Sequence, residues 1–241
     1  MPFNPSLMAL LLAALLSPLP AQTPDPNTPP DNPAPVTATA PNLLPEPDPS
    51  PIPATPPSPP LPLRGFASLP PRTQELIRAA YQLDARGLGY RYGSADPAQG
   101  GMDCSGSVQY LLKTLGWKQL PRASDGFYRW IWQAGTFKAV NGSTFESFEW
   151  AQLQPGDLLF WTGTYEVQKN RDPAISHVMI YLGQDEKSGR RLMFGASEGR
   201  RYLDQTKNGV GIFDFILPRP QSNSSKPQPR FIGYGRLPAQ S

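Results

Sequence analysis

The order of the periodic patterns along the chain predicts an α+β fold. Three segments between residues 63 and 135 carry apolar side chains at helical spacing. Five later segments are short, apolar and β-type, and Gly, Pro, Asn or Asp bounds each of them. Helices first and strands afterwards favour a largely antiparallel sheet of about five strands, with the helices packed on one side of it.

Each expected helix has its own start and stop signals. The first, residues 72–86, follows two prolines and ends before a glycine. The second covers residues 107–115 after Asp103, a good N-cap residue, so Cys104 lies at its start. The third begins at Ser124, which can cap it, and ends before the next glycine.

The expected strands all lie in the second half of the chain. They are residues 157–162, 176–182, 191–196, 209–213 and 231–237. Two connections, residues 136–148 and 162–175, are longer than a minimal link between elements. Because long loops on a rigid scaffold often carry binding residues, we expect these two to shape a cleft.

The N-terminal 62 residues indicate export. An apolar run at residues 7–16, two following prolines and a small residue at position 21 predict a signal peptide over residues 1–21 and a secreted or periplasmic location. The run is about half of the roughly 20 residues that span a bilayer, so a transmembrane anchor is the alternative reading. Residues 22–62 are rich in proline and poor in apolar side chains, which predicts a disordered linker.

Residues 63–241 are expected to form one domain, and we expect a monomer. All 22 Lys and Arg residues lie after residue 63, whereas four of the 19 acidic residues precede it, which leaves this segment with a formal surplus of seven positive charges. An anionic polymer or cell surface suits that charge. No basic run interleaved with aromatic residues and no nucleic-acid module is recognisable, so nucleic acid is not an expected partner.

The chain contains one cysteine, Cys104, and one histidine, His177. A single cysteine cannot form an internal disulfide, so it is a buried core residue, paired with another molecule, or reactive. One Cys and one His are too few for a tetrahedral zinc site, and neither a metal nor a cofactor is expected. A helix N-terminus and a nearby imidazolium both favour a thiolate, which predicts a thiol pKa well below about 8.5.

Three strings resemble the NlpC-type bacterial cell-wall peptidases, a papain-like cysteine peptidase family. They are GYRYGSADPAQGGMDCSGSVQY at residues 89–110, PGDLLFW at residues 155–161 and SHVMIYLG at residues 176–183. The order, the spacing and the neighbouring residues of these strings all match, and the resemblance covers most of residues 63–237. It implies a papain-like fold, with the nucleophile on a helix packed against the sheet.

The resemblance also implies the catalytic roles. Cys104 would be the nucleophile, and His177 the general base and then the general acid. Tyr90 would lie near the thiolate, and Asp103 would cap the helix and fix the rotamer of the thiol. The backbone N–H of Cys104, at a helix N-terminus, is the natural oxyanion donor.

Three further residues are implied to contact the substrate. Arg122 and Ser124, in the string PRAS, match a stretch that helps to line the cleft, and Arg122 could pair with a substrate carboxylate bidentately. Ser105, with Tyr90, could hydrogen-bond the glutamyl part of the substrate.

The chain departs from the family pattern at two positions. Members usually carry a third polar residue, most often His, that orients the imidazole, and Gly195 stands there. Ser197, Glu198 or a backbone carbonyl with a water could substitute, because orientation needs only an acceptor for the second ring N–H. The second departure is Phe127, at a position where members of the family often have a Gln after the Arg-x-Ser string. These departures leave open a weak, differently specific or inactive enzyme.

Three functions are therefore compatible with the sequence. The resemblance implies a cysteine endopeptidase that cleaves the stem peptide of peptidoglycan, commonly between γ-linked D-Glu and the following diamino acid. One alternative is a catalytically silent papain-like module that binds cell-wall peptide or a partner protein. The other is an amidase or acyltransferase on the same scaffold. The sequence leaves open which diamino acid the substrate carries and whether the role is growth, recycling or attack on rivals.

Overall fold

The computed structural model describes residues 62–168, 171–219 and 228–239. The expected signal peptide and residues 22–61 of the expected linker lie outside the described residues, so both remain predictions. Within the part of the chain that is described, no helix combines the length and the apolar character needed to cross a membrane.

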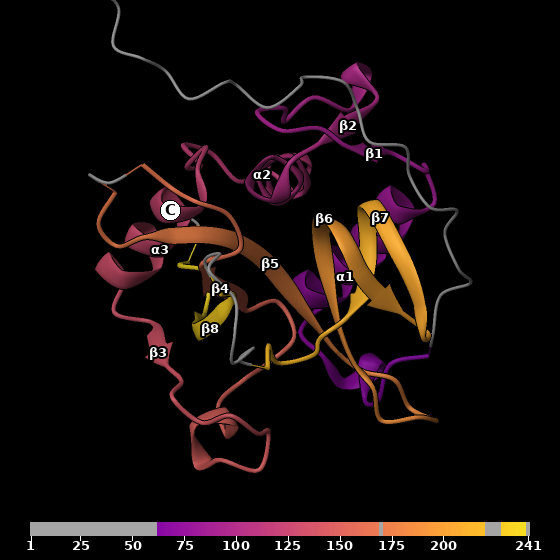
Figure 1. The fold of residues 1–241 in the computed structure, drawn as a ribbon. Helices are drawn as coiled ribbons and strands as arrows, with labels where there is room; N and C mark the ends of the chain where they lie inside the picture. Colours follow the sequence, from indigo (N-terminus) through magenta and orange to yellow (C-terminus); the bar gives the residue numbers. More distant parts are fainter. Residues whose placement is uncertain (1–61, 169–170, 220–227, 240–241) are drawn as a thin grey trace, which may run out of the picture. The chain divides into compact units, whose positions relative to one another are not determined.

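The main sheet has six strands, and every neighbouring pair in it is antiparallel (Figure 1). In spatial order the strands are β3 (Phe137–Ala139), β8 (Arg230–Gly235), β4 (Leu158–Thr162), β5 (Ile175–Gln184), β6 (Arg191–Tyr202) and β7 (Gln205–Asp214). The α+β class is confirmed. The strand that was not expected, β3, comes from the long connection 136–148, and its three residues are half-buried or exposed and show no apolar alternation.

Three helices lie where the sequence predicts them, with shifted starts. They are α1 (Pro71–Asp84), α2 (Cys104–Thr114) and α3 (Ser124–Gln133). Helix α2 was expected to begin at residue 107, but Cys104 is its first residue and directly follows the N-cap Asp103. The expectation that Ser124 caps α3 is wrong, because Ala123 is the N-cap residue and the Ser124 hydroxyl instead donates to the carbonyl oxygen of Ile175 at 3.2 Å.

Short elements complete the approach to α2. Strands β1 (Gly89–Tyr90) and β2 (Gly101–Met102), which precede that helix in the chain, form a parallel pair. Within the described ranges, 3-10 turns occupy Phe66–Ser68, Pro97–Gln99 and Phe148–Trp150. The β1–β2 pair fixes the chain on both sides of the connection 91–100, so that it returns to deliver Cys104 at the start of α2.

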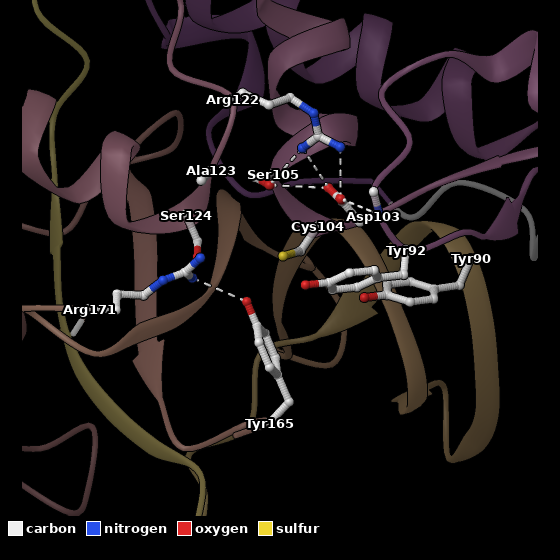
Figure 2. Close-up of a pocket in the computed structure, with 11 residues that line it drawn as sticks. Tyr90, Tyr92, Asp103, Cys104, Ser105, Arg122, Ala123, Ser124, Tyr165 and Arg171 are labelled. Atoms are coloured by element: carbon white, nitrogen blue, oxygen red, sulfur yellow. Dashed lines mark hydrogen bonds and ion pairs between the residues drawn. The ribbon is translucent and has the colours of Figure 1, made fainter. Parts of the chain in front are cut away.

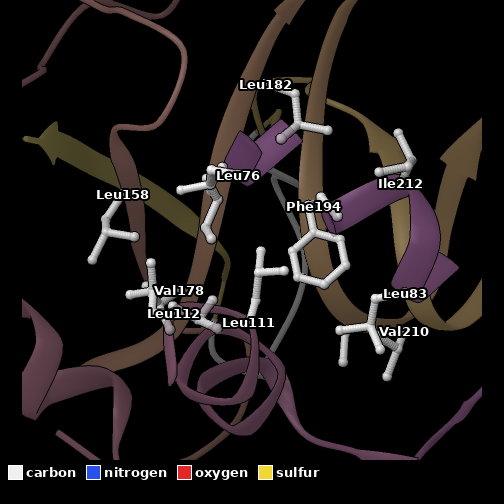
Figure 3. Packing of buried hydrophobic residues seen from close by; sticks show 14 of the residues in the cluster. Leu76, Leu83, Leu111, Leu112, Leu158, Val178, Leu182, Phe194, Val210 and Ile212 are labelled. Carbon is white, nitrogen blue, oxygen red and sulfur yellow. The ribbon is translucent and has the colours of Figure 1, made fainter. Parts of the chain in front are cut away.

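Apolar side chains cover both faces of the sheet. Strand β5 alternates, so Val178, Ile180 and Leu182 pack with residues of the three helices, whereas Met179 and Tyr181 pack on the other face. Figure 3 shows Val178 and Leu182 in the cluster on the helix side. Helices α2 and α3 both contact β5, and α1 contacts β7. The start of α2 is therefore held against β5, the strand that carries His177.

Candidate active site

The first turn of α2 is organised around the Asp103 carboxylate. Its Oδ1 accepts hydrogen bonds from the backbone N–H of Gly106 at 2.6 Å and from the Ser105 hydroxyl at 3.1 Å, and its Oδ2 accepts from the N–H of Gly93 at 3.0 Å. The expected N-cap is confirmed. A carboxylate here is favoured by the partial positive charge of the helix N-terminus.

Gly106 is required because the chain passes very close to this turn. A Cβ at position 106 would lie 2.1 Å from the carbonyl oxygen of Ser94 and 2.9 Å from the Cα of Ala95. Real Cβ atoms do not approach backbone so closely, so only glycine lets the 94–95 segment cross the first turn. The last letter of the DCSG string therefore serves packing around the site rather than chemistry.

Arg122 forms a bidentate ion pair with Asp103. Its Nη1 donates to Oδ1 at 3.1 Å and its Nη2 to Oδ2 at 2.8 Å, while Nη1 also reaches the Ser105 hydroxyl at 3.1 Å. From the sequence, the guanidinium of Arg122 was expected to bind a carboxylate of the substrate. In the structure it binds the carboxylate of Asp103 instead. Arg122 positions Asp103 and Ser105 beside the thiol.

The residues expected from the sequence to surround the thiol meet at one cavity of about 210 Å³. Six of them line it, namely Tyr90, Asp103, Cys104, Ser105, Arg122 and Ser124. Figure 2 shows the Cys104 sulfur between the rings of Tyr90 and Tyr92 on one side and Ser124, Arg171 and Tyr165 on the other.

Tyr92, Tyr165 and Arg171 are lining residues that the sequence reasoning missed. Tyr92 lies two residues after Tyr90 and packs edge-on against Tyr165, with ring centroids 6.3 Å apart. Tyr165 and Arg171 come from the connection between β4 and β5, whose length was the available signal. Of the two long connections, only this one contributes to the cavity lining; the segment 136–148 contributes β3 instead.

The Cys104 thiol is buried, with 6% of the residue exposed. Burial, and then the negative charge of Asp103, raise the pKa of the thiol to about 11. The N–H groups of Val178 and Ser105 and the Arg122 charge act in the opposite direction and do not overcome burial. This differs from the expected depressed pKa: in the free protein the structure favours the neutral thiol.

His177 lies on β5 directly before Val178, the residue whose N–H faces the sulfur. It is 6% exposed and does not itself line the cavity. Its ring packs against that of Trp161 in a T-shaped arrangement, with centroids 5.6 Å apart. Its Nε2 is buried without a hydrogen-bond partner among the described residues. Burial, and then the charge of Arg200, hold the pKa of His177 well below 6.5.

Arg200 is a second residue that the sequence reasoning missed. A register shift between Ser197 and Arg200 carries its side chain back along β6, and the guanidinium lies over the Trp161 ring, 4.9 Å from the centroid. Its Nε donates to the Ser197 hydroxyl at 3.1 Å. Burial lowers the pKa of Arg200 to about 10, so it is a cation at neutral pH in the surroundings of the imidazole.

The position of the missing third residue is filled by a neighbouring side chain. A Cβ on Gly195 would lie 2.9 Å from Cε and 3.0 Å from Cγ of Met179. Of the suggested substitutes, Ser197 is engaged by Arg200 and Glu198 is exposed. Because Nε2 of His177 has no partner among the described residues, neither orients the ring at that nitrogen.

No cluster of three or more His, Cys, Asp or Glu side chains able to hold a metal ion occurs in the described ranges. The groups that the site presents are a thiol at a helix N-terminus, an imidazole on the adjoining strand, and hydroxyl and guanidinium donors around one cavity.

A thiol on the first turn of a helix that packs against an antiparallel sheet, with an imidazole on the adjoining strand, is the arrangement of a papain-like cysteine hydrolase. The sequence profile of the NlpC/P60 family matches residues 87–213, so the chain belongs to the NlpC/P60 family. The matched range contains Tyr90, Cys104 and His177.

A curated relative is the gamma-DL-glutamyl hydrolase of Bacillus subtilis (strain 168). It is 28% identical over 144 residues, which cover 57% of this chain and 29% of the relative. The chain thus spans less than a third of the length of that protein. No solved structure matches the chain.

Proposed function

We propose that the protein is a cysteine endopeptidase that hydrolyses the stem peptide of bacterial peptidoglycan at the bond between a γ-D-glutamyl residue and the following diamino acid. The observation that carries the proposal is the position of Cys104: the first residue of α2, its sulfur at a cavity lined by hydroxyl and guanidinium groups. Membership of the NlpC/P60 family and the name of the curated relative support the same reaction class.

The first step in this proposal is proton transfer from the Cys104 sulfur to the His177 imidazole. With the thiol pKa raised to about 11 and the imidazole pKa lowered, the free protein holds a neutral pair. Forming the thiolate and imidazolium therefore costs free energy, and the attack on the substrate must follow the transfer closely. The thiol is then deprotonated by His177 as it attacks, rather than being a thiolate already in the free protein.

The thiolate attacks the carbonyl carbon of the scissile amide, forming a C–S bond and a tetrahedral oxyanion. In this proposal the N–H of Cys104, at the start of α2, donates to the oxyanion. Collapse of this intermediate breaks the C–N bond, and His177 gives its proton to the leaving amine. Water, deprotonated by His177, then hydrolyses the thioester and restores the thiol.

The lining of the cavity suits an acidic substrate. It contains two guanidinium groups, Arg122 and Arg171, and one carboxylate, Asp103. Asp103 neutralises Arg122 through their bidentate pair, which leaves a positive surplus at Arg171. Stem peptides that contain γ-linked D-Glu carry free carboxylates, so their charge is complementary to this surplus.

The proposal is tested by digestion of purified peptidoglycan and of free muropeptides with the full chain and with Cys104→Ala, followed by mass spectrometry of the products. We expect the native protein alone to release fragments cut after the γ-D-glutamyl residue. Products cut at the sugar–peptide amide, or transfer products, would instead establish the amidase or the acyltransferase.

A catalytically silent binding module is the second candidate, and one observation favours it. Nε2 of His177 has no hydrogen-bond partner among the described residues, and the third polar residue of the family is replaced by Gly195. An imidazole without an orienting acceptor is a poorer base. Binding of muropeptide without cleavage, unaffected by alkylation of Cys104, would identify this module.

We also propose that the protein is exported, on the basis of the apolar run at residues 7–16 and the cleavage-compatible residue at position 21. Determination of the N-terminal residue of the chain isolated from the producing cell tests this. A start close to residue 22 supports cleavage, whereas an intact Met1 in a membrane fraction supports an anchor.

A further inference from the structure

The two guanidinium groups at the cavity beside Cys104, those of Arg122 and Arg171, differ in how their donors are used. Arg122 is occupied by Asp103 on both nitrogens of its fork. Arg171 makes both of its hydrogen bonds through the same nitrogen, Nη1, which donates to the Tyr165 hydroxyl and to the carbonyl oxygen of Ile175, each at 3.2 Å. Its Nη2 and Nε have no partner among the described residues, so the Nε–Nη2 edge of Arg171 is free to bind a carboxylate, whereas the Nη1–Nη2 edge of Arg122 is taken by Asp103.

The charge of Arg171 is also only partly balanced. The nearest carboxylate is that of Asp125, whose Oδ1 lies 3.8 Å from Nη1, beyond hydrogen-bond distance. The other oxygen of Asp125 is bound by Arg129, four residues further along α3. Two guanidinium groups thus share one carboxylate, and Oδ1 remains without a hydrogen bond. One positive charge in this group is uncompensated, on the side that faces the cavity.

Tyr165 completes the arrangement. Its hydroxyl oxygen accepts from Arg171, which leaves its own O–H free to donate (Figure 2). Burial raises the pKa of Tyr165, so the hydroxyl keeps its proton over the physiological range. A neutral O–H donor held beside unused guanidinium N–H groups matches the two oxygens of a carboxylate.

We propose that Arg171 and Tyr165 form the subsite that binds a carboxylate of the substrate next to the scissile bond, so that this chain's specificity for acidic peptides comes from the connection between β4 and β5. The inference rests on the proposed function, because the substrate is taken to be a stem peptide. Two carboxylates of such a peptide could occupy the subsite: that of the γ-D-glutamyl residue and that of the diamino acid.

The test is a calorimetric titration of the full chain carrying Cys104→Ala, which binds without turnover. The ligands are L-Ala-γ-D-Glu-L-Lys, the same peptide with the glutamyl carboxylate replaced by a carboxamide, and the same peptide with the lysine carboxylate replaced. We expect one of the two carboxamides to bind on the order of ten-fold more weakly than the tripeptide. The carboxylate that is replaced in that peptide is the one that the subsite binds.

The matched variants separate Arg171 from general charge effects. Arg171→Gln should remove the preference, giving the tripeptide and its carboxamides the same Kd. Arg171→Lys, which keeps the charge and loses the planar fork, should retain part of it. Arg201→Gln removes an equal charge from an exposed side chain that binds Asp204, and it should leave the preference unchanged.

The outcomes distinguish this inference from the proposed function. Equal affinity for all three peptides, absence of binding to any of them, or a preference that survives in Arg171→Gln would overturn the subsite. Digestion with the Cys104 protein runs in parallel. Cleavage without any carboxylate preference refutes the subsite alone, whereas a preference that Arg171→Gln removes, in a protein that cleaves nothing, refutes the peptidase and supports the subsite.

Discussion

The two partners of the proposed catalytic pair lie in unlike surroundings. On the thiol side, Cys104 has an N-cap, an ion pair and a cavity in which every predicted lining residue is present. On the imidazole side, His177 is buried against Trp161, its Nε2 has no hydrogen-bond partner among the described residues, and the charge of Arg200 disfavours its protonation. The family's third polar residue, which would orient the imidazole, is replaced on the second side by Gly195.

The difference shows which half of the pair is prepared in advance. Hydrogen bonds to Asp103 hold the thiol side in place, because a carboxylate with several donors is costly to disturb. The imidazole packs against Trp161 in a T-shaped contact, and Met179 fills the space that a side chain at position 195 would take. Binding on the thiol side should therefore be robust, whereas turnover should depend on the imidazole side.

The largest expected effect is that of His177→Ala. If the imidazole carries the proton, the variant should lose on the order of a thousand-fold or more in kcat while it still binds muropeptide. Steady-state kinetics and calorimetry on the same preparation measure both quantities. Retained turnover would show that His177 takes no part in the chemistry, and it would refute the claim that turnover depends on the imidazole side.

The next largest effect is expected for Asp103→Ala on the thiol side. Loss of the cap and of the Arg122 pair should lower the free energy of unfolding by about 1–3 kcal/mol and kcat/KM by on the order of ten- to a hundred-fold. Asp96→Ala is the matched control, since Asp96 caps the 3-10 turn Pro97–Gln99 outside the cavity. Equal effects of both substitutions on kcat/KM would mean that Asp103 contributes stability only.

The pH dependence of thiol alkylation compares the two partners directly. Because burial raises the pKa of Cys104 to about 11, the thiolate is scarce at neutral pH, and the alkylation rate should keep rising as the pH increases toward that value. Between the lowered imidazole pKa and the raised thiol pKa the free protein should hold the neutral pair. An alkylation rate that levels off below pH 8.5 would contradict this and restore the expectation from sequence.

The smallest effect is expected for Arg200→Gln. A nearby positive charge disfavours the imidazolium, so removing it should raise the pKa of His177, which should still stay below 6.5 because burial is the larger cause. His177 is the single histidine, so its ring resonances can be titrated by NMR without ambiguity. Arg201→Gln is the control. An unchanged pKa of His177 in Arg200→Gln would show that the charge of Arg200 does not lower that pKa.

On the thiol side, local signals predicted α2, its cap and the place of Cys104, and the resemblance to the family implied the other predicted lining residues. A cap, a glycine and a periodic apolar stripe within one segment determine where α2 begins, and the residues from 90 to 124 that line the cavity lie in or beside that segment. The helix start was off by three residues and the Ser124 cap was wrong, because the Ser124 hydroxyl is used by the carbonyl oxygen of Ile175, which is distant in sequence.

The remaining features depend on contacts that no local pattern encodes. Tyr165 and Arg171 reach the cavity only through the path of the β4–β5 connection. Arg200 reaches the surroundings of His177 through the register shift in β6. Strand β3 forms because it pairs with the last strand, β8, nearly a hundred residues further along the chain, and its own three residues show no strand alternation.

The most direct test of the central claim is the mass of the intact protein, quenched in acid during turnover of a stem peptide. The account predicts a fraction whose mass is increased by the acyl part of the substrate, with the increment mapped to Cys104 and absent in Cys104→Ala. Cleavage of the peptide by a protein that carries no such thioester, and by Cys104→Ala as well, would contradict the assignment of Cys104 as the nucleophile.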